Sequence, residues 1–199
     1  MTHPVRGGFA GGFALAAAAA GTTWLALLSW RGFTEQPVRF LGPLLVLGAV
    51  IAGTGAVARW ARLSAPLVVL CQVVVSGALA STMISGSPVP VGPAWERLQD
   101  SFADALVSAE RYAAPLPSHV APVDPILIAG GFGCLLLVDF LACTLRRVPL
   151  AGLPLLTVYS VPVSILLSGV SWVVFAATAG GFLLMLFLQE SEQVARWGR

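Results

Sequence analysis

The chain has 199 residues, of which 57% are hydrophobic and 10% charged; its mean hydropathy is +0.88 and its formal net charge +2. This composition lies far outside the range of water-soluble globular proteins, so it excludes a soluble fold. The net charge says little about partners, and we expect no nucleic acid among them.

Six apolar stretches follow one another along the chain, and each has roughly the 17–25 residues that a helix needs to cross a bilayer. They cover residues 9–30, 40–57, 66–84, 126–145, 150–167 and 170–188. Backbone inside a bilayer must satisfy its own hydrogen bonds, and long continuous apolar runs favour helices over the alternating strands of a membrane barrel. The sequence therefore predicts an all-α integral membrane protein, a bundle of six transmembrane helices in one domain covering 1–199.

The longest polar connector, residues 85–125, contains one further helical pattern. Apolar residues recur there at three- and four-residue spacing through 94–113, after a proline that suits the first helical position. We expect an amphipathic helix that lies on the outer membrane surface or caps the bundle, with substrate binding as the alternative.

Arginines beside the predicted spans set the expected orientation, because positive residues next to a span are retained in the cytoplasm. With the N-terminus inside, seven arginines fall in cytoplasmic segments: Arg6, Arg59, Arg62, Arg146, Arg147, Arg196 and Arg199. Four fall in outer segments: Arg31, Arg39, Arg97 and Arg111. We therefore place both termini in the cytoplasm and the 85–125 loop outside the cell.

Nucleophilic and metal-ligating residues form no recognisable pattern. Cys71, Cys134 and Cys143 lie in predicted spans without CxxC spacing, and His3 and His119 fall on opposite sides of the membrane. Buried free cysteines pack as small apolar side chains. We expect no catalytic residue, no metal site and no cofactor in this chain.

One ionisable side chain, Asp139, lies at membrane depth, about two turns before Arg146. A lone buried carboxylate is costly, so we expect it to be protonated or paired. Long arginine side chains reach it from the cytoplasmic end, which favours a structural ion pair with Arg146 or Arg62 and leaves a proton-coupled role as the alternative. Gln72, the other deep polar side chain, is expected to form an interhelical hydrogen bond.

Two prolines, Pro154 and Pro162, interrupt the fifth apolar stretch. Proline lacks a backbone donor and frees a carbonyl inside a helix, so we expect a kink there. A transporter could use such a broken helix, but a structural kink is the commoner outcome.

Several ordered motifs cover much of the chain. The second half contains D-F-L-A at 139–142, L-R-R-V-P-L-A-G-L-P-L-L at 145–156, Y-S-V-P at 159–162 and R-W-G-R at 196–199. Earlier, R-L-S-A-P-L-V at 62–68 leads to Gln72, and R-Y-A-A-P occupies 111–115. In this order the motifs resemble the N-terminal transmembrane domain of the bacterial TgpA-type transglutaminase-like membrane proteins.

The resemblance implies a division of labour in the full-length protein. In that family the membrane domain is followed by a further span, an extracytoplasmic transglutaminase-like domain with a Cys-His-Asp constellation, another span and a cytoplasmic tail. We expect this catalytic domain to be absent from the chain, which would then be a fragment or truncated product and no enzyme by itself. The family's catalytic residues do not carry over to the three cysteines in the spans.

The resulting hypothesis is a domain of the bacterial plasma membrane that anchors and positions an extracytoplasmic transglutaminase-like, or peptidase-like, module at the cell envelope. Its expected partners are the lipid bilayer, the outer domain of the full-length protein and other envelope proteins. The alternative is a transporter of a small-molecule or lipid-linked envelope substrate, with Asp139, Gln72 and the Pro154/Pro162 kink along its path.

Overall fold

The computed structural model describes residues 7–117, 119–166 and 169–197, and the side chains of 11–117, 119–166 and 169–191. Within these ranges the protein is helical without a β-strand, and six helices are long and apolar enough to cross a membrane. This confirms the predicted all-α bundle of six transmembrane helices with an additional helix in the loop between the third and fourth spans. The predicted span end at Leu167, both chain termini, and Arg6 and Arg199 lie outside the described residues.

The helices follow one another along the chain in this order: α1 (Gly7–Leu27), the 3-10 helix η1 (Leu28–Phe33), α2 (Val38–Trp60), α3 (Ala65–Ser85), α4 (Pro93–Arg111), α5 (Asp124–Asp139), the π-helix η2 (Phe140–Thr144), α6 (Val148–Ile165) and α7 (Trp172–Trp197). Four of them, α3 to α6, carry a proline in the first helical positions, where its missing N–H costs no hydrogen bond. Helix α3 ends at Gly86, whose φ of 77° is a left-handed conformation that favours glycine.

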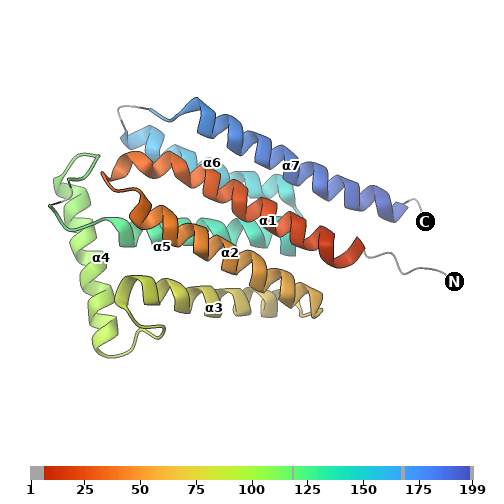
Figure 1. The fold of residues 1–199 in the computed structure, drawn as a ribbon, viewed down its shortest axis with the longest axis horizontal. Coiled ribbons are helices and arrows are strands. Elements are labelled where there is room, and N and C mark those ends of the chain that lie inside the picture. Colours follow the sequence, from red (N-terminus) through yellow and green to blue (C-terminus); the bar gives the residue numbers. More distant parts are fainter. Residues whose placement is uncertain (1–6, 118, 167–168, 198–199) are drawn as a thin grey trace.

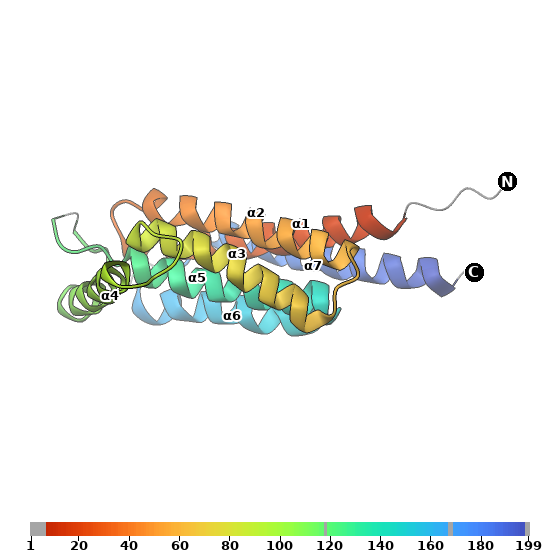
Figure 2. The ribbon, with the colours of Figure 1, turned by 90° about the horizontal axis from the view of Figure 1, so that it is seen from below.

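The spans run side by side along the long axis of the molecule, and α4 crosses them at one end (Figure 1). In the view turned by 90°, α4 is strongly foreshortened, so it runs across the spans rather than along them (Figure 2). The first turns of α1 and the last turns of α7 lie at the opposite end. We call these the α4 end and the opposite end of the bundle.

Helices α1, α2 and α5 form the centre of the bundle, with α3 beside α2 and α7 beside α1. Their contact requires small residues: a Cβ on Gly131 of α5 would lie 2.7 Å from the methyl groups of Leu44 on α2. Only 11% of the most apolar stretch of α7 is buried, against 44% for α2 and α5. Helix α7 is therefore the least buried of the six candidate spans in the described part of the chain.

Candidate functional site

A buried polar cluster joins three spans near the opposite end of the bundle. Asp139, the last residue of α5, accepts hydrogen bonds from Arg59 on α2 and Gln72 on α3. The Arg59 Nη1 lies 2.9 Å from Asp139 Oδ2, and Nη2 lies 3.4 Å from Oδ1. The Gln72 Nε2 donates to Asp139 Oδ2 at 2.7 Å and to the carbonyl of Ile51 at 3.0 Å. We call Arg59, Gln72 and Asp139 the polar cluster.

The burial of these side chains explains why they contact one another. Asp139 and Gln72 are buried, whereas the Arg59 side chain keeps 19% of its surface exposed. A buried charge is tolerated when it is paired and its remaining polar atoms are hydrogen-bonded. The cluster therefore pairs the buried carboxylate of Asp139 and links α2, α3 and α5.

Gly55 provides the space in which the cluster assembles. It lies one helical turn before Arg59, and a Cβ at this position would lie 2.3 Å from Gln72 Nε2 and 2.9 Å from Arg59 Nη1. Both distances are shorter than those that real Cβ atoms show to their neighbours, so a larger residue would displace the amide and the guanidinium together.

The π-helix η2 directly follows Asp139 and shapes the same region. The amide of Leu145 donates to the carbonyl of Phe140 at 2.8 Å, five residues back. In an α-helix, residues five apart point about 140° away from each other; the wider π turn brings them closer to one side. Thr144 is accordingly placed with its hydroxyl 3.5 Å from Arg59 Nη1, at the limit of a hydrogen bond.

The structure brings Gln72 and Asp139 together but corrects the arginine that pairs with the carboxylate. The partner is Arg59, and neither Arg62 nor Arg146 takes this place. Helix α2 continues past its predicted end at Val57, so Arg59 lies on the helix and faces α5. Arg62 and Arg146 lie beyond helix ends, are exposed, and have positive φ values of 57° and 55°.

Pro154 and Pro162 both lie inside α6, which is helical from Val148 to Ile165, and the kink there stays a prediction. Because Pro162 has no N–H, the carbonyl of Val158, four residues earlier, lacks its intrahelical donor. The indole Nε1 of Trp30 supplies that donor at 2.8 Å. This contact was not predicted from the sequence, although a buried tryptophan needs an acceptor and a proline inside a helix frees one.

The predicted spans also hold the three cysteines, on separate elements. Cys71 lies on α3, Cys134 on α5 and Cys143 in η2, and none forms a disulfide. Within the described ranges, no three His, Cys, Asp or Glu side chains lie close enough to hold a metal ion. The geometry of these residues gives no basis for assigning a reaction to them.

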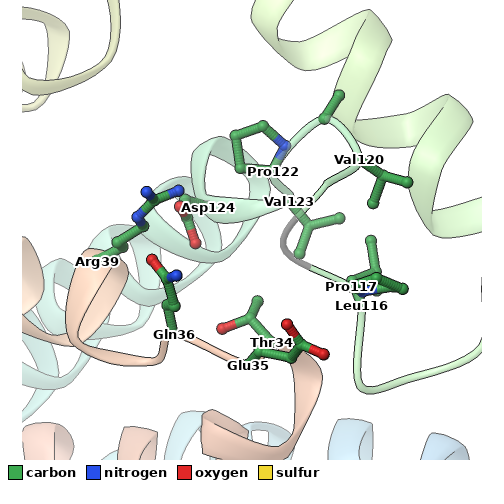
Figure 3. Close-up of a pocket in the computed structure, with 11 residues that line it drawn as sticks. Thr34, Glu35, Gln36, Arg39, Leu116, Pro117, Val120, Pro122, Val123 and Asp124 are labelled. Atoms are coloured by element: carbon green, nitrogen blue, oxygen red, sulfur yellow. The ribbon is translucent and has the colours of Figure 1, made fainter.

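A small notch lined by both polar and apolar residues lies at the α4 end, between the connector after η1 and the loop before α5 (Figure 3). Arg39 and Asp124 lie next to each other on one side of it. The amide of Leu116 donates to the carbonyl of Phe33 at 2.9 Å, which ties the two segments together. The notch has a volume of about 30 Å³, which fits two or three waters, because each needs about 10–15 Å³ of such space.

The fold and the polar cluster define a multi-pass helical membrane domain whose deep carboxylate is paired inside the bundle. Residues 14–199 match the family model of the TgpA N-terminal domain, and the chain belongs to that family. It is therefore the membrane domain of a TgpA-type protein, and the family name fits a domain of a transglutaminase-like protein. No curated protein and no solved structure matches the chain.

Proposed function

We propose that this domain anchors and positions an extracytoplasmic transglutaminase-like, or peptidase-like, module at the cell envelope and carries out no reaction itself. The proposal places the domain in the bacterial plasma membrane with the α4 end outside and both chain termini in the cytoplasm. The observation that carries it is the family membership over residues 14–199.

The construction of the α4 end supports a positioning role. Helix α4 lies across the spans rather than along them, and the segment that follows it is bonded to η1 through Leu116 and Phe33. A Thr34–Leu116 backbone bridge adds to this connection. These ties hold a folded surface over the end of the bundle, against which an exported domain would be oriented.

The polar cluster supports the anchor over the transporter. Proton relays inside membranes are chains of Asp, Glu and His side chains. Asp139 instead accepts from both Arg59 and Gln72, and Gln72 is also bonded to the backbone of α2. The proposal assigns this network to holding α2, α3 and α5 in place.

Photo-crosslinking in intact bacteria that express the full-length protein tests the positioning role. A photoreactive amino acid is placed at Glu96 or Asp100, exposed on α4, and as a matched control at Leu63, exposed at the opposite end. We expect light-dependent crosslinks from α4 to a transglutaminase-like domain, on the same chain or a partner, and none from Leu63. Crosslinks from Leu63 alone, or none from α4 while the domain is present, would refute it.

Cysteine labelling of intact cells tests the orientation separately. Single cysteines at Glu35, Ser101 and Gly169 should react with a membrane-impermeant maleimide, and cysteines at Arg62 and Arg147 only after the membrane is opened. Labelling at Arg147 with protection at Ser101 would reverse the orientation.

A further inference from the structure

A cavity of about 280 Å³ opens at the α4 end, between η1, the last turn of α4, the start of α5 and the end of α6. Its walls are aromatic and aliphatic, with Trp30, Phe33, Tyr112, Leu127, Val161 and Ile165 among them. A cavity of about 150 Å³ is enough to bind benzene when its lining is apolar. We call this the apolar cavity.

Trp30 and Phe33 line the apolar cavity, and contacts with neighbouring residues hold their side chains in place. The Trp30 indole is bonded to the Val158 carbonyl, and its ring meets Phe33 edge to face with the centroids 6.4 Å apart. Trp30 also lies against Gly130 of α5, where a Cβ would come within 3.2 Å of the ring. Both aromatic side chains are buried, so packing holds this side of the cavity in place.

The position of the cavity along the bundle places it at the level of lipid chains. Leu127 and Gly130 lie three and six residues after Asp124, the first residue of α5. At 1.5 Å per residue this is about 4–9 Å below the start of the helix. Helix α4 is amphipathic and crosses the bundle end, and such helices lie at the boundary between headgroups and acyl chains. The cavity beneath its last turn is thus at acyl depth.

The cavity is open to the surroundings of the bundle. Its wall includes Ile165 and Tyr112, which are 57% and 44% exposed. Water gains little in such a space, because a buried water needs two to four polar partners and the lining offers few. At this depth the molecules that surround the protein are lipids, whose chains match the lining chemically.

From this depth, lining and opening we propose that the apolar cavity binds one acyl chain of a membrane phospholipid from the leaflet at the α4 end. The chain enters between α4 and α6 and lies on the Trp30 ring. This site is independent of the anchoring role, since it depends only on the cavity and the bilayer.

Photolabelling of the purified protein in phosphatidylethanolamine and phosphatidylglycerol vesicles tests the proposal. The probe is a phosphatidylethanolamine with a diazirine in its acyl chain, and adducts are mapped by mass spectrometry. We expect adducts on Trp30 or Gly130, which a lipid chain reaches through the cavity. Ala109→Trp, which fills the cavity from α4, should lower their yield several-fold, whereas Ala103→Trp, an exposed alanine of α4 outside the lining, should leave it unchanged.

Several results would overturn the site. Adducts confined to outward-facing residues of α6 such as Leu156 and Val163 would mean ordinary lipid contact without a bound chain. Equal labelling of Trp30 in Ala109→Trp and the wild type would also exclude the cavity. A free diazirine fatty acid that labels Trp30 while the phospholipid does not would exclude the phospholipid. If Ala109→Trp fails to fold, the wild-type adduct map decides.

Discussion

The two ends of the bundle differ in how their helices contact one another. At the opposite end, polar side chains from three spans meet at 2.7–3.4 Å around Asp139, and a methyl group on Gly55 would displace Gln72 and Arg59. At the α4 end, aromatic and aliphatic side chains line the apolar cavity of about 280 Å³. The hydrogen-bonded side chains of the polar cluster are closely packed, whereas the apolar side chains at the α4 end leave a cavity between them.

This difference between the two ends follows from the hydrocarbon that surrounds the bundle. A polar group in hydrocarbon has no partner other than the protein, so it must be placed within hydrogen-bonding distance of one. An apolar side chain loses little when it faces a lipid tail instead of another helix, because the two are equally apolar. A membrane bundle can therefore keep an apolar cavity open to lipid, but not an unpaired carboxylate.

Loss of Arg59 should have the largest effect on stability. Arg59→Leu leaves the buried Asp139 carboxylate without its charge partner, which costs about 3–5 kcal/mol of unfolding free energy. Asp139→Asn should cost less, because the partly exposed Arg59 side chain can extend to the membrane surface. Denaturation of the purified variants with SDS measures the unfolding free energy that each substitution costs. Arg62→Leu is the matched control, and a cost equal to that of Arg59→Leu would contradict the pairing.

A methyl group on Gly55 should have an intermediate effect. Gly55→Ala places a Cβ against Gln72 and the Arg59 guanidinium, and overpacking of this kind costs about 1–3 kcal/mol. Gly53→Ala, on the same helix with nothing within 4 Å of its Cβ, is the control and should change stability by about 0.5 kcal/mol or less. Equal effects of the two substitutions would show that the polar cluster tolerates expansion.

Trp30→Phe at the α4 end should have the smallest effect. It removes the donor to the Val158 carbonyl, a loss of about 0.6–1.7 kcal/mol by the values for hydrogen bonds inside membranes. In a Pro162→Ala background the helix regains an N–H for that carbonyl, so the cost of Trp30→Phe should decrease. Unfolding of the two single variants and the double variant measures the change; an unchanged cost would mean that the indole bond does not replace the missing donor.

The spans and the amphipathic helix could be predicted because length, hydropathy and periodicity are local properties. The loop helix was expected over 94–113 and is observed as Pro93–Arg111. That Asp139 would need a partner also followed from its burial in an apolar run, since a lone carboxylate there is costly.

The identity of that partner could not be predicted from the same signals. Hydropathy placed Arg59 beyond the end of a span, whereas its contact with Asp139, 80 residues away, accompanies the continuation of α2 to Trp60. The π turn of η2 has no periodicity signal of its own, and Trp30 contacts a carbonyl 128 residues away. Each of these features depends on tertiary contacts.

The central claim is that Arg59 and Asp139 form a structural ion pair within the polar cluster. A double-mutant cycle between these two residues tests it most directly. Arg59→Leu, Asp139→Leu and the double variant are compared by unfolding in the same detergent. We predict that the double variant is more stable than the sum of the single losses implies, by about 0.5–3 kcal/mol, because neither charge is left alone. Additive losses would contradict the claim, as would an Asp139→Leu variant of unchanged stability.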